Sequence, residues 1–533
     1  MISGLVAIGV YLPTLGFQFV WDDINLIVYN QDPPLRAFGQ SFWAGSGEHL
    51  GSDPYYRPLA NFSLRLDRLI AGRTPWFFHL VNILLHASVC VLFALLIFMV
   101  TGSWKSGQFA ALFLALHPLF ADCVAYVSGR TDLLTGLGLL IACLGLIEYM
   151  KKGGWVNLIL VLAGFALAVF SKESGLFFIL IVLIWILFKG KVKRCGVVLA
   201  GVAVIAAIYL FARYQVLGSL VGMKAADRFL PLIITGLNSF GQQLSLLFFP
   251  FNRVIFYCSS GDFVRLNVWG VIGLVYLFLP LLFLRLKQRF YPLLGWFWSV
   301  VFLLPVAVLA PFGPSGRLLY LPALGVLLML VAVARLIATR PIEKRVLVVV
   351  AVCLSVFFIP FLWRRMRLWQ NEERLFSRMV KEAPDYAPGH YNLGSVLLKK
   401  GDETGAIAHY RRAVALDSGL SVAGFNLAAL LQRRGEYEEA EMLLRRVIRD
   451  KPGYAQAYAN LALIVLNKGD LALALDLQKK SAELAPADPN IFYNLALLFR
   501  RKGELDSARK ALGRAIELDP RNPRFRSLWD KLQ

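Results

Sequence analysis

The stretch YNLGSVLLKKGDETGAIAHYRRAVALD, residues 391–417, decides the fold of the C-terminal part of this chain, because its pattern recurs three more times. The recurring residues are Asn392, Asn426, Asn460 and Asn494, with Gly401, Gly435, Gly469 and Gly503. Successive members are 34 residues apart (426 − 392, 435 − 401). A period of this length predicts a solenoid of helix pairs, in which each pair buries its apolar face only against its neighbours.

The period is that of tetratricopeptide repeats, and we expect about four repeats plus a capping helix over residues 384–533. Small residues recur where the helices must approach closely, and helix breakers follow each unit: Gly394, Ala428, Ala462 and Ala496, then Pro452, Pro486 and Pro520. Stacked repeats form a concave groove. Either this groove holds an extended acceptor segment, or the array only docks a partner or caps the outer face.

The residues before the repeats have the composition of a membrane protein. The chain is 58% hydrophobic and 17% charged, with a mean hydropathy of +0.60, which excludes a soluble globular protein. Apolar runs of near-spanning length begin near residues 1, 76, 107, 131, 155, 174, 195, 267, 291, 318 and 346. We therefore predict an all-α fold: a polytopic bundle of about 11 transmembrane helices over residues 1–363, followed by the solenoid.

Basic connectors set the expected orientation. Lys105, the pair at 151–152, the KGKVKR run at 189–194, and the clusters at 285–289 and 335–345 fall on one side, which the positive-inside rule makes cytoplasmic. The N-terminus is then cytoplasmic and the repeats lie outside, in the periplasm for a bacterial inner membrane or in the lumen for an endoplasmic reticulum membrane.

Two segments do not fit the simple series of spans. Counting the apolar stretch at 230–250 as a span would invert every helix after it, so residues 212–266 are predicted to be re-entrant or to lie on the outer surface. A coupling helix into the repeats is predicted over residues 364–383. This segment follows Trp363 and begins RRMRLWQNEERLF.

Charge and cysteine usage exclude other classes of protein. The net charge of +22 divides into +14 up to Trp363 (27 − 13) and +8 after it (29 − 21), so neither part is a nucleic-acid-binding arm. The six cysteines lack CxxC or CxxH spacing, which indicates neither a zinc site nor a disulfide framework. Of the 13 acids in the membrane part, all but Glu148 and Glu343 fall on the outer side, where we expect chemistry.

The first outer loop, residues 19–75, carries a candidate base and a candidate anion ligand. Asp22 and Asp23 stand where the first helix leaves the membrane, and a carboxylate there can deprotonate an acceptor hydroxyl. The alternative is an Asx turn or a helix cap. Arg57 offers a planar fork for a lipid phosphate, or it only extends to ordinary headgroups.

The later outer segments add further candidates. The stretch ALHPLFADCVAYVSGRTDLL holds His117, Asp122, Arg130 and Asp132. In one interpretation, one of the acidic and basic groups meets the acceptor and the other stabilises the phosphate charge. In the alternative, Arg130 pairs with Asp122 or Asp132 and locks the loop. Lys172 and Glu173 form a local ion pair in the default interpretation. Arg317 and Tyr320 share one face of a helix start.

These segments together resemble the transmembrane and tetratricopeptide-repeat protein O-mannosyltransferases, a branch of the GT-C glycosyltransferases related to the protein O-mannosyltransferases. The resemblance covers nearly the whole chain, and the order of its motifs is specific. The motifs are VWDD at 20–23, YRPL at 56–59, FHLVNILLH at 78–86, the ALHP to DLL stretch at 115–134, KESG at 172–175, RLLYLP at 317–322 and W.NEERLF at 369–376.

The resemblance implies a polyprenyl-phosphate sugar as donor, with mannose favoured, and a protein Ser or Thr hydroxyl as acceptor. By position, Asp22 or Asp23 is the base, with Asp22 favoured, and Asp122 stands where an acid, commonly Glu, is expected. The donor lipid phosphate is assigned to Arg57, Arg130, Lys172 and Arg317, and supporting roles to His117, Asp132, Glu173 and Tyr320. Gly316 departs from the family, whose members carry an acid there.

The same resemblance implies direct displacement at the anomeric carbon without a divalent metal or other cofactor. Two other readings stay open: an inactive membrane-anchored scaffold, and a ligase for lipid-linked oligosaccharides. The sequence specifies neither the sugar, the acceptor nor the oligomeric state.

Overall fold

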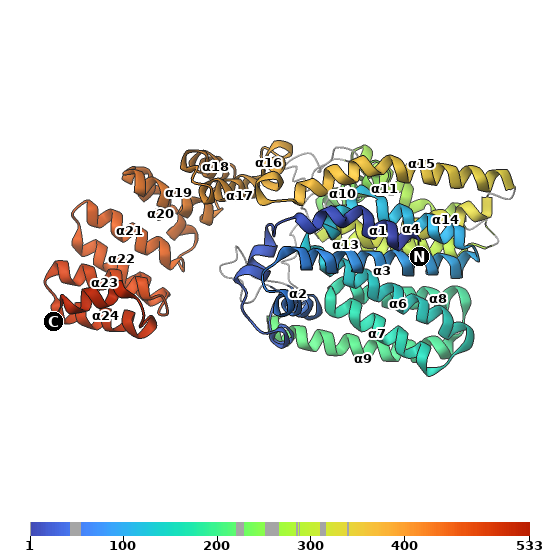
Figure 1. Ribbon diagram of the computed structural model, residues 1–533, viewed down its shortest axis with the longest axis horizontal. Helices are drawn as coiled ribbons and strands as arrows, with labels where there is room; N and C mark the ends of the chain where they lie inside the picture. The colour runs from blue at the N-terminus through green and yellow to red at the C-terminus, as the bar shows by residue number, and fades with distance from the viewer. Residues whose placement is uncertain are drawn as a thin grey trace. The chain divides into compact units, whose positions relative to one another are not determined.

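The computed structural model describes residues 2–42, 55–219, 229–250, 266–283, 286, 288–309, 316–337 and 341–532. Within these residues the chain is helical and contains no β-strand, which confirms the all-α prediction (Figure 1). The chain forms two compact units, Met1–Ala383 and Pro384–Gln533.

The first unit is a bundle of helices. Its α-helices are α1 (Ile2–Tyr11), α2 (Pro58–Ala71), α3 (Pro75–Thr101), α4 (Trp104–Leu116), α5 (Ala121–Val124), α6 (Arg130–Lys152), α7 (Trp155–Ser171), α8 (Phe178–Lys189), α9 (Val192–Leu217), α10 (Phe229–Phe248), α11 (Val268–Phe278), α12 (Pro280–Phe283), α13 (Phe290–Leu309), α14 (Tyr320–Ile337), α15 (Pro341–Met366) and α16 (Glu372–Glu382). The described residues between them include the 3-10 turns η1 (Leu12–Gly16), η4 (Pro118–Phe120), η5 (Val127–Gly129), η6 (Glu173–Phe177), η8 (Gly316–Leu319) and η9 (Arg367–Trp369). The first outer loop holds a π-helix, η2 (Ile24–Tyr29), and a further 3-10 turn, η3 (Pro34–Gly39).

Four helical segments of the described chain are long and apolar enough to cross a membrane: Pro75–Thr101, Val127–Lys152, Val192–Leu217 and Gly316–Ile337. A fifth arises if α4 and the bent segment Pro118–Val124, which meet at 57°, count as one span. Several other apolar helices are shorter than a full crossing, among them α7. The predicted total of about 11 spans stays a prediction.

Close helix contact in the bundle depends on small residues. A Cβ atom at Gly138 of α6 would lie 2.6 Å from the carbonyl oxygen of Gly164 in α7, and one at Gly164 would lie 2.5 Å from the nitrogen of Ala142. Any larger side chain would therefore separate these two helices, as expected for packing of apolar helices by van der Waals contact.

Two segments outside the simple series of spans can be compared with the sequence expectations. In its described part the segment 212–266 includes the end of α9 and a continuous α10, which packs along α11 and α13. Its assignment as a re-entrant or surface segment stays a prediction. The coupling segment 364–383 is two helices rather than one. α15 runs on to Met366, η9 follows, and Asn371 caps a new helix by accepting a hydrogen bond from the backbone N–H of Arg374.

The second unit has the predicted repeats. Its helices are α17 (Ala387–Lys399), α18 (Glu403–Leu416), α19 (Ser421–Arg434), α20 (Tyr437–Asp450), α21 (Ala455–Asn467), α22 (Leu471–Leu484), α23 (Pro489–Lys502), α24 (Leu505–Leu518) and α25 (Pro523–Asp530). The first helix of each pair starts 34 residues after the start of the first helix of the preceding pair (421 − 387, 455 − 421, 489 − 455). The repeating glycines lie between the two helices of each pair at φ from 81° to 95°, a region that favours glycine.

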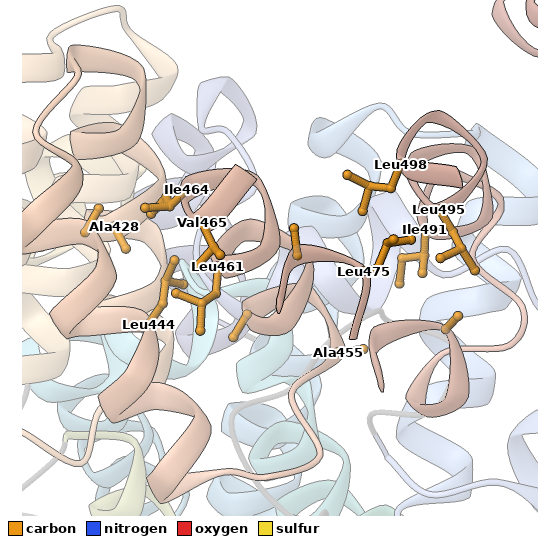
Figure 2. Packing of buried hydrophobic residues seen from close by; sticks show 14 of the residues in the cluster. Ala428, Leu444, Ala455, Leu461, Ile464, Val465, Leu475, Ile491, Leu495 and Leu498 are labelled. Carbon is orange, nitrogen blue, oxygen red and sulfur yellow. The ribbon is translucent and has the colours of Figure 1, made fainter. Parts of the chain in front are cut away.

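The repeats share one continuous apolar core, shown in part in Figure 2. Leu461 and Ile464 of α21 are at most 2% exposed, and Leu444 of α20 and Ile491 of α23 lie in the same cluster. Each pair thus buries its apolar face against the next, the physical reason for the period.

Candidate functional site

Asp22 is held at the start of the first outer loop by an aromatic cluster. The hydroxyl of Tyr126 donates to its Oδ2 at 2.5 Å, and the ring of Tyr126 stacks on Trp369 at 4.7 Å and on Trp21 at 6.2 Å between centroids. The backbone of Trp21 has φ 55°, a value that residues other than glycine rarely adopt. Backbone strain next to a half-buried carboxylate is typical of functional sites.

Asp23 has a different environment from its neighbour. Its side chain is fully buried and accepts hydrogen bonds from the backbone N–H of Ser128 at 2.8 Å, the Ser128 hydroxyl at 2.5 Å and the backbone N–H of Val20 at 3.3 Å. Burial raises the pKa of Asp23 to about 7, against these hydrogen bonds, which lower it. Asp23 therefore ties the first loop to the turn after Tyr126.

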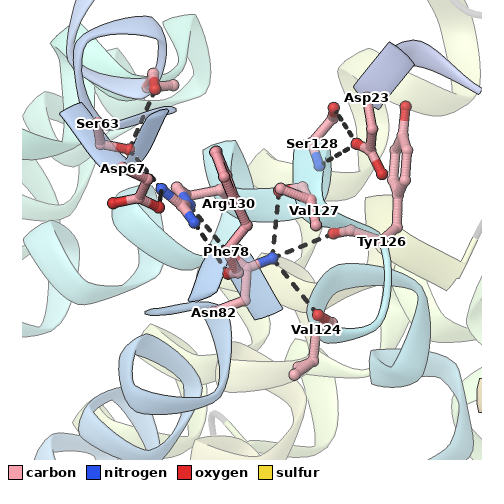
Figure 3. A network of polar contacts seen from close by, with 11 residues as sticks. Asp23, Ser63, Asp67, Phe78, Asn82, Val124, Tyr126, Val127, Ser128 and Arg130 are labelled. Carbon is pink, nitrogen blue, oxygen red and sulfur yellow. Dashed lines mark hydrogen bonds and ion pairs between the residues drawn. The ribbon is translucent and has the colours of Figure 1, made fainter. Parts of the chain in front are cut away.

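Arg130 lies at the centre of a buried network (Figure 3). Its guanidinium pairs with Asp67 at 2.5 Å and donates to Asn82, Ser63 and the carbonyl of Phe78. The same Asn82 side chain donates to three carbonyl oxygens of the following turn: Val124 at 3.4 Å, Tyr126 at 3.2 Å and Val127 at 3.2 Å. Arg130 is fully buried, so its donors serve the protein and fix the turn that carries Tyr126.

Asp122 forms an ion pair with a residue distant in sequence. Arg365 donates to both its oxygens, at 2.8 and 2.7 Å, and the indole N–H of Trp369 donates at 3.0 Å. The alternative in which Arg130 pairs with Asp122 or Asp132 is therefore wrong, since Arg130 pairs with Asp67. A Cβ at Gly316 would lie 2.4 Å from Oδ2 of Asp122, which leaves no room for an acid at that position.

The predicted local pair of Lys172 and Glu173 is also wrong, because these neighbours point to different partners. Lys172 donates to Asp132 at 2.6 Å, and Glu173 accepts two hydrogen bonds from Arg57, at 2.6 and 3.0 Å. Burial alone would raise the pKa of Glu173, but the charge and hydrogen bonds of Arg57 hold it at about 2. The Arg57 guanidinium also lies 4.3 Å from the ring centroid of Tyr55.

Arg317 is the exception among the four predicted phosphate ligands. In the described part of the chain its guanidinium makes no hydrogen bond or ion pair, and it lies over the ring of Tyr126 at 5.8 Å from the centroid. It is half-buried and close enough to Asp22 and Asp132 to interact with them electrostatically. Its five N–H donors are thus available to an anion.

His117 and Tyr320 belong to the helix packing. His117 bonds the carbonyl of Leu247 in α10 at 3.0 Å through Nε2, and the Tyr320 hydroxyl bonds His86 at 2.8 Å. Both side chains are fully buried. Among the described residues no group of three or more His, Cys, Asp or Glu side chains is placed to hold a metal ion.

The structure thus brings Asp22 and Arg317 together around Tyr126, next to the pairs Lys172–Asp132 and Arg57–Glu173. Sequence reasoning did not single out Tyr126 or Trp369. Both lie inside motifs that carry the family resemblance, AYVSGR and W.NEERLF. Their place in these motifs was the feature of the sequence that could have identified them as site residues.

Comparison with known proteins supports the resemblance. Residues 53–218 match the family described as dolichyl-phosphate-mannose-protein mannosyltransferase, and residues 397–464, 455–488 and 489–522 match tetratricopeptide repeats. Asp22 and Arg317 lie outside the first match. This combination confirms the predicted pairing of a mannosyltransferase-like membrane domain with tetratricopeptide repeats.

Curated relatives bear the name of the same activity. Human protein O-mannosyl-transferase TMTC4 is 28% identical over 77% of this chain and 65% of its own length, and human protein O-mannosyl-transferase TMTC2 is 36% identical over 29% of this chain and 19% of its own. The chain therefore spans less than two thirds of these relatives. The solved structure of MamA aligns with 28% of this chain at 24% identity and a TM-score of 0.26.

Proposed function

We propose that this chain is a membrane glycosyltransferase that moves a sugar, with mannose favoured, from a polyprenyl phosphate to Ser or Thr hydroxyls of protein acceptors. The observation that carries the proposal is the placement of two groups against Tyr126: a half-buried carboxylate, Asp22, and the guanidinium of Arg317, which has no acceptor among the described residues. The names of the relatives supply the sugar and the acceptor class.

The proposed step is a single displacement. The acceptor hydroxyl attacks the anomeric carbon and gives its proton to Asp22, while the bond from that carbon to the phosphate oxygen breaks and the lipid phosphate leaves. Asp22 suits the base because it is partly accessible, whereas the oxygens of Asp23 are buried against Ser128 and Val20. Tyr126 donates a hydrogen bond to Asp22 and orients it.

Arg317 would stabilise the phosphate charge that develops as the bond breaks, since guanidinium donors match phosphate oxygens. In this proposal Arg57 and Lys172 act indirectly: each is paired with a carboxylate and shapes the charge around Arg317. A single phosphate as leaving group needs no divalent ion to neutralise a pyrophosphate, and no metal or other cofactor is proposed.

The proposal also assigns an orientation. By the distribution of basic connectors, the N-terminus is cytoplasmic and the site faces the periplasm or the lumen, together with the repeats. The repeats are proposed to bind the acceptor or a partner protein. A scaffold without activity and an oligosaccharide ligase are the competing functions, and the following experiment separates them.

The test measures transfer of labelled mannose from polyprenyl-phosphate mannose to protein in membranes that carry the chain, with the glucose donor in parallel. Asp22→Asn should abolish transfer, and Arg317→Gln should lower it by about 100-fold or more. Arg335→Gln, in the last turn of helix α14, which follows the turn η8 that carries Arg317, changes an exposed arginine and should leave transfer unchanged. Folded wild-type protein that transfers neither sugar would refute the proposal and favour the scaffold or, with a lipid-pyrophosphate donor, the ligase.

A further inference from the structure

A basic pocket lies at the C-terminal end of the repeats, between α23 and the capping helix α25. Its volume is about 410 Å³. The residues that line it are Tyr493, Leu497, Arg500, Pro523, Arg524, Ser527, Leu528 and Lys531. Three of these are cations and none is acidic, while Tyr493, Leu497 and Leu528 supply an apolar floor.

The three cations of this pocket, Arg500, Arg524 and Lys531, are exposed and have no ion pair within the described chain. Arg524 instead rests over the ring of Tyr493 at 5.2 Å. Several other arginines of the repeats are paired: Arg411 with Glu439 at 2.7 Å, Arg412 with Asp385 at 2.9 Å and Arg514 with Glu517 at 2.9 Å. The pocket thus gathers three cations that no acidic side chain of the described chain pairs with.

The repeat packing does not require these cations. At the positions equivalent to Arg500 (500 − 34, 466 − 34, 432 − 34), the earlier repeats carry Leu466, Gln432 and Leu398. The position equivalent to Lys531 in the preceding unit is Leu497 (531 − 34). Neutral side chains are sufficient for the helix pair, so the charge at the last repeat calls for another explanation. A polar face on a capping helix accounts for solubility, but not for cations arranged around an apolar floor.

We propose that this pocket binds an acidic segment of a partner polypeptide. Its carboxylates would pair with Arg500, Arg524 and Lys531, and a neighbouring apolar side chain would rest on Leu497 and Leu528. The volume lies within the range of pockets that enclose a small ligand, so it accommodates a few side chains. A nucleic acid would need a longer basic track than this single pocket provides. Binding here is independent of sugar transfer by the membrane domain.

The test uses the full chain in detergent and a fluorescein-labelled peptide of alternating Glu, Ser and Gly residues, followed by fluorescence anisotropy. A control peptide carries Gln in place of every Glu. The variant with Arg500→Glu and Arg524→Glu is compared with Arg446→Glu, an exposed arginine of α20 that also has no ion pair within the described chain. Thermal unfolding confirms that each variant is folded.

We expect the acidic peptide to bind wild-type protein and the Arg446→Glu variant alike, and the double variant about 10-fold more weakly, because two surface pairs are lost and each costs up to about five-fold. Binding should also weaken as salt is raised. Equal binding of the Gln peptide, unchanged binding by the folded double variant, or no binding by wild-type protein would each overturn the proposal. Sugar transfer is expected to be unaffected in membranes carrying the double variant when free peptide is the acceptor.

Discussion

Removing one hydroxyl group, in Tyr126→Phe, tests whether Tyr126 positions the proposed base. The ring contacts with Trp369 and Trp21 remain, and only the 2.5 Å hydrogen bond to Asp22 is lost. A hydrogen bond to a charged group contributes about 1.5 to 3 kcal/mol. Since each 1.4 kcal/mol is a factor of ten in rate, kcat should fall by about 10- to 100-fold with little change in KM for the donor.

The pH profile gives a readout that a loss of stability would not produce. The hydrogen bond favours the ionised form of Asp22, so without it the carboxylate keeps its proton to a higher pH. The acid limb of the profile of kcat against pH should therefore move to higher pH. The assay is mannose transfer in membranes across a pH series.

Tyr276→Phe is the matched control, because it removes another buried tyrosine hydroxyl, one that bonds Ser299 at 2.6 Å between α11 and α13. It should lower stability without moving the acid limb. If Tyr126→Phe is folded and retains the wild-type kcat and pH profile, the positioning role of Tyr126 is refuted, and Asp22 loses its main support as the base.

Three further outcomes follow from individual contacts. Asp122→Asn leaves the buried Arg365 without its ion pair and should destabilise the protein by about 3 to 5 kcal/mol in detergent, whereas Asp506→Asn on the repeat surface should change stability by less than about 0.5 kcal/mol. Burial raises the pKa of Asp23 to about 7, above the value near 4 of an unfolded chain, so the native state binds the extra proton and stability falls as pH rises from about 4 to 7. Thermal unfolding of Asp23→Asn should lack that part of the pH dependence, and an equal slope in the variant would contradict this assignment. Gly435→Ala, at φ 81°, should destabilise the repeats by about 1 kcal/mol in chemical unfolding, and no change would show that the turn tolerates a side chain.

The repeats and the all-α fold could be predicted from the sequence because both depend on local patterns. A glycine every 34 residues indicates a turn whose backbone needs positive φ, and the small residues at the same period indicate close contact between helices. Span number was less accessible, since several apolar helices are shorter than a full crossing. The coupling segment was predicted as one helix, and the break inside it was not, because a single capping side chain, that of Asn371, starts a new helix there.

The sequence by itself determined which residue types are available for chemistry at the outer loops, including Asp22, Asp122, Arg130 and Arg317. Only the tertiary structure decided which of them are engaged. Arg130 and Asp122 have the same types of functional group as Arg317 and Asp22, but their donors and acceptors are taken up by Asp67 and Arg365, 63 and 243 residues away (130 − 67, 365 − 122). Hydrogen bonds and ion pairs act over a few ångströms, and proximity on that scale between distant residues comes from the packing of helices, which no local pattern in the sequence records.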